Sequence, residues 1–337
     1  MRRALAAVAA LVLLLLTTSV GPARADVRPV CRFSDPRLTE ISGITWSWSH
    51  AGVWWVHNDS GGGPYVYAVD GATCRTLARI RVAGIGARDL EAVGTGVDPR
   101  GRKVLWLADI GDNVDGWRSV RLHAIVEPRS LVDQTVRATT YRFTYADGPH
   151  NAEAILVSPT RAEVYVITKQ LARGGLYRVP LQGSGVAVAQ RIADVRGLVT
   201  DAAMSPDGTG YVVRDYLGAT IHPAPVGAAT IAAGSALDVP DEPQGEAISF
   251  TRDGTSLVVA SERDVRLLPV SLSSPTPTAT SSAQPTATAS DPAPATSSPA
   301  APAADGSTPT VLRLVAFALL VVAAAAVAVW AARRFRH

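Results

Sequence analysis

Short apolar runs bounded by Gly, Pro, Asp and Ser fill the chain between about residues 26 and 272. Such runs are typical of β-strands, and no long stretch of this region has the 3.6-residue period of an amphipathic helix. The clearest runs are residues 52–56, 103–107, 163–167, 210–213 and 256–259. The pattern predicts an all-β domain over residues 26–272.

The strand-like runs belong to a repeating unit. A first strand lies roughly ten residues before each run, turns such as those at 205–208 and 251–254 join the two, and a third strand follows. The first strands are marked by Gly43, Glu91, Glu153, Asp201 and Glu246, at intervals of 48, 62, 48 and 45 residues. Repeats of about 40–50 residues are typical of propeller blades. We therefore expect a single β-propeller of five or six blades; a β-sandwich is the competing architecture, and the regular spacing argues against it.

Both ends of the chain carry targeting signals. A basic start, an apolar stretch and an Ala-Arg-Ala motif mark residues 1–25 as a secretory signal peptide, with an uncleaved anchor as the alternative. Residues 311–332 contain a charge-free apolar run that is long enough to cross a membrane. The basic tail 333–337 then places the C-terminus in the cytoplasm. We expect a single-pass protein of the cell membrane with its propeller outside the cell.

Between the propeller and the predicted span, residues 273–310 consist almost wholly of Pro, Thr, Ser and Ala. A segment of this composition buries too little apolar surface to fold. We expect a disordered stalk, either O-glycosylated or a plain linker, that spaces the propeller from the membrane.

Composition narrows the possible partners. The chain has 337 residues, of which 47% are hydrophobic, so wholesale disorder is excluded. Of its 32 basic and 29 acidic residues, seven arginines lie near the two ends and two aspartates lie in the stalk, which leaves 25 basic and 27 acidic residues between them. This slightly negative balance gives no electrostatic reason to expect nucleic acid as a partner.

The chain has two cysteines, Cys31 and Cys74. In an exported protein we expect them to form a disulfide, because exported compartments are oxidising. Their spacing is not that of a redox-active C-x-x-C pair. Cys31 precedes the first blade, so the bond would help to close the propeller.

Ionisable residues recur at the start of the first strand and at the end of the second strand of each unit. Because neighbouring strands are antiparallel, these two places lie at the same end of a blade, and the innermost strand begins beside the central opening. First strands begin with Asp89, Glu91, Glu153, Asp201 and Glu246, and second strands end with His57, Asn58, Asp59, Asp109, Asp112, Asn113, Lys169, Arg214, Asp215, Glu262 and Arg263. We expect these residues to converge on one face of the propeller.

Carboxylates that face one another repel and require a cation, basic partners or raised pKa values. Carboxylate and amide oxygens are hard ligands that suit Ca²⁺. The predicted metal ligands are Glu91, Asp109, Asp112, Glu153, Asp201 and Glu246. The predicted ligand contacts are His57, Asp59, Asn113, Lys169, Arg214, Glu262 and Arg263. A salt-bridged network without an ion is the alternative.

Five motifs carry a resemblance to a known group: His57-Asn-Asp-Ser-Gly61, Asp109-Ile-Gly-Asp-Asn113, Asp147-Gly-Pro-His-Asn-Ala-Glu-Ala154, Val166-Ile-Thr-Lys169 and Gln244-Gly-Glu-Ala247. Over residues 38–270 the chain resembles exported bacterial propeller proteins described as WD40-like or phytase-like. It is more distantly similar to calcium-dependent propeller phytases. That similarity implies Ca²⁺ at Asp109, Asp112, Glu153 and Glu246, and phosphate at Lys169, Arg214 and Arg263.

Two classes of function follow. The first is a cell-surface module that binds a small molecule or a protein through an acidic, cation-binding face. The second is a calcium-dependent hydrolase of phosphoesters or other esters. The sequence contains no complete set of a nucleophile, a base and a substrate clamp, so we expect the binding module.

Overall fold

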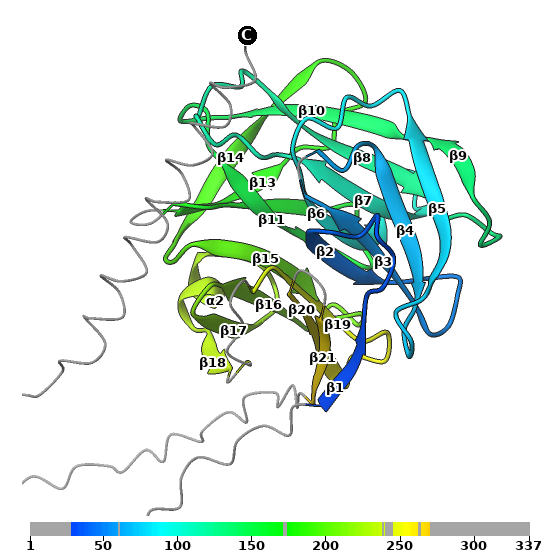
Figure 1. Cartoon of the computed structure of the whole chain (residues 1–337). Helices are drawn as coiled ribbons and strands as arrows, with labels where there is room; N and C mark the ends of the chain where they lie inside the picture. Colours follow the sequence, from blue (N-terminus) through cyan, green and yellow to red (C-terminus); the bar gives the residue numbers. More distant parts are fainter. Residues whose placement is uncertain are drawn as a thin grey trace, which may run out of the picture. The chain divides into compact units, whose positions relative to one another are not determined.

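The computed structural model describes residues 28–59, 61–170, 174–237, 239, 245–261 and 264–269. These residues form 21 strands and one short helix, α2 (Ala228–Ala232). Twenty of the strands make five blades arranged around one axis (Figure 1). From the innermost strand outwards, the blades are β2 (Ile41–Trp46), β3 (Val53–Asn58), β4 (Tyr65–Asp70), β5 (Thr76–Ala83); β6 (Leu90–Val97), β7 (Lys103–Asp109), β8 (Val120–Val126), β10 (Thr139–Tyr145); β11 (Ala152–Val157), β12 (Val164–Thr168), β13 (Gly174–Val179), β14 (Val186–Val195); β15 (Val199–Met204), β16 (Gly210–Asp215), β17 (Gly218–Pro223), β18 (Ser235–Leu237); and β19 (Ala247–Phe250), β20 (Ser256–Ala260), β21 (Asp264–Pro269), β1 (Arg28–Arg32).

The five blades form a closed ring. Inner strand β2 contacts β6, β6 contacts β11, β11 contacts β15, β15 contacts β19, and β19 contacts β2 again. The N-terminal strand β1 pairs antiparallel with β21 and so completes the fifth blade (Figure 1). Because the ring is closed, the inner strand of each blade contacts the inner strands of the two neighbouring blades. The predicted single propeller is confirmed, and its described residues form five blades rather than six.

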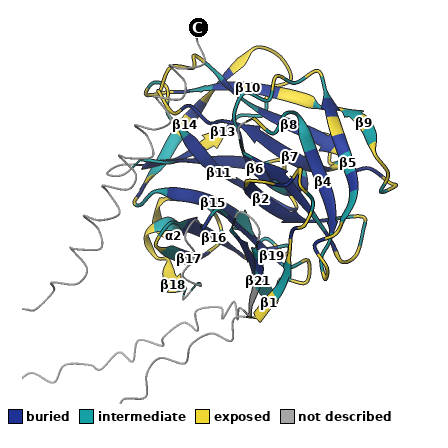
Figure 2. Cartoon of the chain, in the orientation of Figure 1, coloured by how far each residue is buried: buried dark blue, intermediate teal, exposed yellow. Residues whose placement is uncertain are grey.

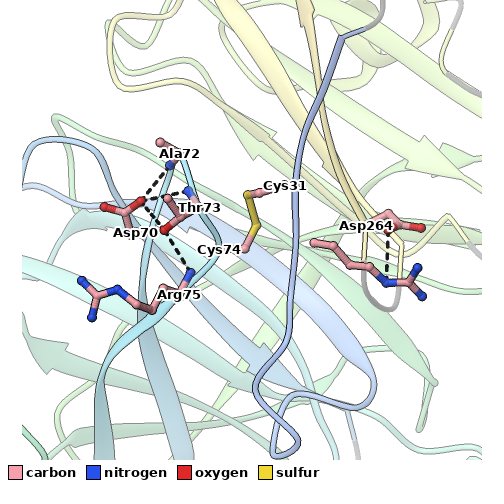
Figure 3. The surroundings of a disulfide bond; sticks show 8 residues. Cys31, Asp70, Ala72, Thr73, Cys74, Arg75 and Asp264 are labelled. Carbon is pink, nitrogen blue, oxygen red and sulfur yellow. Dashed lines mark hydrogen bonds and ion pairs between the residues drawn. A yellow bond between two sulfur atoms is a disulfide. The ribbon is translucent and has the colours of Figure 1, made fainter.

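A disulfide fastens the closing strand to the next blade. Cys31 in β1 is bonded to Cys74 in the turn between β4 and β5 (Figure 3). Asp70 shapes that turn, because its Oδ1 accepts the backbone N–H of Ala72 and of Thr73, at 3.2 and 2.9 Å. The predicted pairing of the two cysteines is the one that the structure contains, and it joins blades five and one.

Tight turns at one end of the blades follow a shared pattern. The backbone N–H of Gly208 donates to Ser205 O, and that of Gly254 donates to Thr251 O, at 2.9 and 2.8 Å. Both glycines have positive φ, 73° and 72°, a conformation that costs glycine little. The turns predicted at 205–208 and 251–254 are confirmed.

The interval of 62 residues in the second repeat contains an additional strand. After β8 the chain leaves its blade and forms β9 (Gln134–Arg137), which pairs parallel with β5 of the first blade. It then returns as β10, which pairs with β8 and also, in parallel, with β14 of the third blade. The insertion therefore ties the outer edges of the first three blades together.

Five hydrophobic clusters hold the ring together, one between each pair of neighbouring blades. Between the second and third blades, for example, Trp106 and Phe143 share a cluster with Ile155 and Tyr177. Figure 2 shows mostly buried residues along the inner strands and exposed residues at the outer edges and loops. Burial between rigid sheets fixes the positions of the strand ends that carry the candidate site.

The predicted signal peptide, stalk, span and tail, residues 1–25 and 273–337, lie outside the described residues. Among the residues that are described, no helix has the length and apolar character needed to span a bilayer.

Candidate functional site

Inner strands of four blades bulge at equivalent positions. The ladder shifts between Ile41 and Gly43, Leu90 and Ala92, Ala152 and Ala154, and Val199 and Asp201. The additional residues are therefore Ser42, Glu91, Glu153 and Thr200. A bulge redirects a side chain and is common next to binding sites. In the second and third blades the redirected side chain is a carboxylate.

Three carboxylates of the first two blades meet beside these bulges. Asp59 follows β3, Asp89 precedes β6, and Glu91 is the bulge residue of β6. One oxygen of each lies within 4.8 Å of the others, and this is the group among the described residues whose ligand atoms are placed to hold a metal ion. Glu91 is buried, whereas Asp59 and Asp89 are half-buried. We call Asp59, Asp89 and Glu91 the acidic cluster.

The loop after β7 supports the acidic cluster. An ideal Cβ at Gly111 would lie 2.3 Å from both Asp89 Oδ2 and Glu91 Oε1, so these oxygens occupy the space that a side chain would fill. Asn113 Nδ2 donates to Asp89 Oδ2 at 3.4 Å, and its Oδ1 accepts Asn151 Nδ2 at 3.3 Å. The motif that contains Gly111 and Asn113 thus shapes the site.

A buried ion pair lies on the third blade. Lys169 Nζ donates to both carboxylate oxygens of Glu153 at 2.6 Å and to Tyr216 Oη at 2.7 Å. Glu246 lies close enough for its charge to raise the pKa of Glu153 and of Tyr216. Tyr216, which follows β16 of the fourth blade, therefore links the Lys169–Glu153 pair to the fourth and fifth blades.

Negative charge is poorly compensated across this face. Burial and the neighbouring carboxylates of Asp59, Asp109 and Asp112 raise the pKa of Asp89 to about 6. Burial and the charges of Glu153, Asp59 and Asp89 raise the pKa of Glu91 well above its ordinary value. Glu153 has a pKa of about 7, because burial outweighs the stabilising effect of Lys169. A cation bound here would stabilise the ionised forms.

Asp109 is a predicted ligand that lies outside the acidic cluster. Its Oδ1 accepts the N–H of Asp89 at 2.9 Å, and its Oδ2 is 2.9 Å from Arg121 Nη1 and 3.8 Å from Arg88 Nε. Burial raises the pKa of Asp109, but these donors and His123 lower it by more than burial raises it. The net pKa of Asp109 is therefore below its ordinary value. Asp109 therefore holds the blade together.

Asp112 and Asp201 likewise serve the backbone. Asp112 accepts the N–H groups of Gly116 and Trp117 at 2.9 and 2.7 Å, which shapes the loop after β7. Asp201 is 1% exposed and accepts the N–H groups of Ala202 and Ile248, both at 2.8 Å. The structure does not bring either carboxylate into the acidic cluster.

Predicted ligand contacts differ in their accessibility. His57 is fully buried, and its Nδ1 lies 2.8 Å from Asn58 O; burial lowers its pKa. Arg214 is 2% exposed and donates to Ala247 O at 3.0 Å across the fourth and fifth blades. Neither side chain is exposed to a ligand. Asp59, Asn113 and Lys169 lie at or beside the acidic cluster, whereas Glu262 and Arg263 lie outside the described residues.

Asp89 is absent from the predicted metal ligands. Asp59 is predicted as a contact for the bound ligand and not as a metal ligand. Asp89 is two residues from Glu91, a spacing that is compatible with one strand face and could have indicated its role. Gly111 lies inside a motif that is visible in the sequence, but only the packing shows that its missing side chain makes room for two carboxylates. The loop after β7 brings Gly111 to them.

No family model matches this chain, and no curated protein matches it. Among solved structures, an aldose sugar dehydrogenase from Streptomyces coelicolor in its PQQ-bound form is similar, with 11% identity and a TM-score of 0.44 over 73% of this chain and 99% of that one. A chain of the mitotic checkpoint complex has 13% identity and a TM-score of 0.34 over 67% of this chain and 60% of that one. The propeller assignment rests on the strand order and on the ring of inner-strand contacts.

Proposed function

We propose that this chain is a membrane-anchored, extracytoplasmic propeller that binds a ligand or a protein partner through a calcium-bearing acidic cluster. The observation that carries this proposal is the close approach of Asp59, Asp89 and Glu91, whose oxygens lie within 4.8 Å of one another. Ca²⁺ binds oxygen at about 2.3–2.6 Å, so two oxygens on one ion lie at most about 5 Å apart. The spacing of the three carboxylates fits that limit.

Two further observations support a cation at this place. The raised pKa values of Asp89 and Glu91 indicate that ionisation is opposed by burial and by neighbouring charge, and a divalent ion removes that opposition. Asp59 and Asp89 are half-buried rather than buried, so an ion bound to them could still contact a ligand.

Binding fits the geometry better than hydrolysis. The phosphoester form of the hydrolase alternative assigns phosphate to Lys169, Arg214 and Arg263, of which Arg263 lies outside the described residues. Lys169 instead contacts Glu153 and Tyr216, and Arg214 is buried against Ala247. We therefore propose a binding module.

The location forms part of the proposal. Residues 1–25 and 311–332 carry the export and membrane signals, and the observed disulfide suits an oxidising compartment. Protease treatment of intact cells should release the propeller. A propeller protected inside the cell would contradict the proposed location while leaving the cation site open to test.

Calorimetric titration of the full chain in non-ionic detergent with Ca²⁺ tests the site. We expect saturable binding, with the free energy of unfolding raised by about 2.7 kcal/mol at one hundred times the dissociation constant. Asp89→Asn should abolish both effects. Asp133→Asn is the matched control, because Asp133 is exposed and accepts the Arg79 N–H on the outer edge of the first blade. Absence of calcium binding, or equal binding by Asp89→Asn, would refute the site.

A further inference from the structure

Three arginines, Arg88, Arg121 and Arg142, lie close together on the second blade. Arg121 in β8 pairs in register with Arg142 in β10, and on its other side with Asp109 in β7. Residues that are directly opposite in an antiparallel ladder have neighbouring side chains on the same face, where like charges destabilise the sheet. The ladder therefore places two guanidinium groups side by side with one carboxylate.

Arg88, which precedes β6, joins this pair. Arg88 Nη2 donates to Ser119 O at 3.0 Å, and Arg142 Nη2 donates to Ser119 Oγ at 3.2 Å. One residue thus contacts two of the three guanidinium groups. Arg121 reaches the same place through Asp109, which is also within ion-pair distance of Arg88.

Positive charge exceeds negative charge in this group. Among the described residues, Asp109 is the carboxylate within ion-pair distance of the cluster, and it serves both Arg88 and Arg121. Asp112 lies nearby, but its oxygens accept the backbone N–H groups of Gly116 and Trp117. Each guanidinium has five N–H donors, so most donors of the three arginines are left over after these bonds.

An apolar rim adjoins the arginines. The Trp117 ring lies 4.0 Å from the Arg88 guanidinium carbon and is 45% exposed, and Val114 in the same loop is 85% exposed. Arg88 and Arg121 keep 20% and 25% of their side chains exposed, and Arg142 is exposed. The cluster is therefore accessible, and an anion held there would have an aromatic and an aliphatic surface beside it.

We propose that Arg88, Arg121 and Arg142 bind a phosphate monoester whose organic part packs on Trp117. Guanidinium groups bind phosphate through paired, charge-assisted hydrogen bonds, and a monoester offers three terminal oxygens, one for each arginine. Its charge of about −1.5 to −2 at neutral pH also balances the cluster better than a single carboxylate does. The monoester belongs either to a small soluble molecule or to a phospholipid headgroup.

Titrating the full chain in non-ionic detergent and calcium-free buffer tests the proposal. The probes are phenyl phosphate, dihexanoyl phosphatidic acid and benzoate. The chain has seven tryptophans, so the difference in fluorescence change between the wild-type chain and Trp117→Ala reports contact with the Trp117 ring. We expect both phosphates to bind and benzoate to bind at least tenfold more weakly, because it has one oxygen and about one charge fewer. Tighter binding of phenyl phosphate indicates a small ligand, and tighter binding of the lipid indicates a headgroup.

The Arg142→Gln variant separates this site from general charge effects. Arg142 is exposed and is outside the Asp109 ion pairs, so its replacement should leave folding intact and raise the dissociation constant about tenfold. Trp117→Ala should weaken binding as well, whereas Arg161→Gln on the third blade, another exposed arginine, should not.

Three results would overturn the proposal. They are absence of binding by both phosphates, benzoate binding as tightly as phenyl phosphate, and unchanged phosphate affinity in Arg142→Gln. A loss of affinity that follows Asp89→Asn but not Arg142→Gln would place the anion at the acidic cluster instead and would also overturn it.

Discussion

Lys169 Nζ lies 2.6 Å from each carboxylate oxygen of Glu153, so the two side chains form one compact, largely buried ion pair. Burial lowers the pKa of Lys169, but Glu153 and Tyr216 raise it more, and its net pKa is above the ordinary value. The amine is therefore a permanent internal cation. It neutralises Glu153 and also lowers the pKa of Glu91, whose net pKa nevertheless stays above its ordinary value.

Replacing Lys169 tests this compensation of charge. Lys169→Met leaves Glu153 unpaired, and removal of one partner of a buried pair costs about 3 kcal/mol. We expect that loss in urea unfolding at pH 8, together with tighter calcium binding, since less negative charge is compensated. Lys103→Met is the control, because Lys103 is the other lysine of the chain and lies over the Trp48 ring. Weaker calcium binding in Lys169→Met would contradict the model.

The stability of the calcium-free protein should depend on pH through its raised carboxyl pKa values. The folded state holds protons on Asp89 and Glu153 up to pKa values of about 6 and 7, whereas the unfolded chain releases them near pH 4. Stability from these groups is complete below pH 4 and is lost as pH rises through 6 and 7. We expect the free energy of unfolding of the calcium-free protein to decrease by a few kcal/mol between pH 5 and pH 8.

The buried histidines act in the opposite direction. Burial lowers the pKa of His57 and of His222, so their contribution increases as pH rises towards 6.5. The wild-type chain and its Glu91→Gln variant contain the same histidines. The difference between their pH curves therefore excludes the contribution of the histidines. The variant should lose less stability than the wild-type chain between pH 5 and pH 8, and parallel curves would argue against proton binding at the cluster.

Gly111 provides a steric test. In Gly111→Ala the new methyl group would displace Asp89 Oδ2 and Glu91 Oε1, each 2.3 Å from its ideal position. Carboxylates at the ends of flexible side chains can move aside, so we expect a loss of about 1 kcal/mol in stability. Their altered spacing should weaken calcium binding at least tenfold. Gly183→Ala, where nothing lies within 4 Å of the added carbon, should change neither quantity.

The propeller could be predicted because its repeat can be recognised from short stretches of sequence, as strand-like runs and as turns such as 205–208. The parallel pairings of β9 with β5 and of β10 with β14 could not, because they join outer edges of different blades. Such contacts depend on how the completed blades are positioned relative to one another. No local pattern of residues specifies them.

The structure brings together only some of the residues that the sequence groups into one candidate site. Equal spacing aligned Asp201 with Glu91 and Glu153, but the bulge residue of the fourth blade is Thr200. Thr200 Oγ1 donates to Gly245 O at 2.9 Å, as Ser42 Oγ donates to the backbone of Glu91. Because strand side chains alternate, an error of one residue moves a carboxylate to the opposite side of the strand.

The disulfide should contribute to closure of the ring. Cys31 and Cys74 are 43 residues apart, and cross-linking a loop of this length stabilises the folded state by about 4 kcal/mol in the chain-entropy model. We expect the variant with both cysteines changed to Ser to unfold at a correspondingly lower urea concentration. Adding reductant to the wild-type chain should reproduce most of the loss. Equal midpoints with and without the bond would show that β1 closes the ring unaided.

Variants of Asp201 and Glu91 should distinguish a carboxylate with a structural role from one that binds the cation. Asp201 uses both oxygens to accept the N–H groups of Ala202 and Ile248, and an amide side chain has one acceptor oxygen. Asp201→Asn therefore leaves a buried N–H unsatisfied and should cost about 2 kcal/mol. It should not change calcium affinity, because Asp201 is outside the acidic cluster.

Glu91→Gln should have the reverse effect. Replacing a buried carboxylate with an amide removes repulsion from Asp59, Asp89 and Glu153, so the calcium-free variant should be at least as stable as the wild-type chain at pH 8. The variant should bind calcium at least tenfold more weakly, because one charged ligand is lost. Paired calorimetry and urea unfolding of the two variants measure both quantities. If Asp201→Asn loses calcium binding and Glu91→Gln retains it, the cation site lies between the fourth and fifth blades, and the assignment to Asp59, Asp89 and Glu91 is wrong.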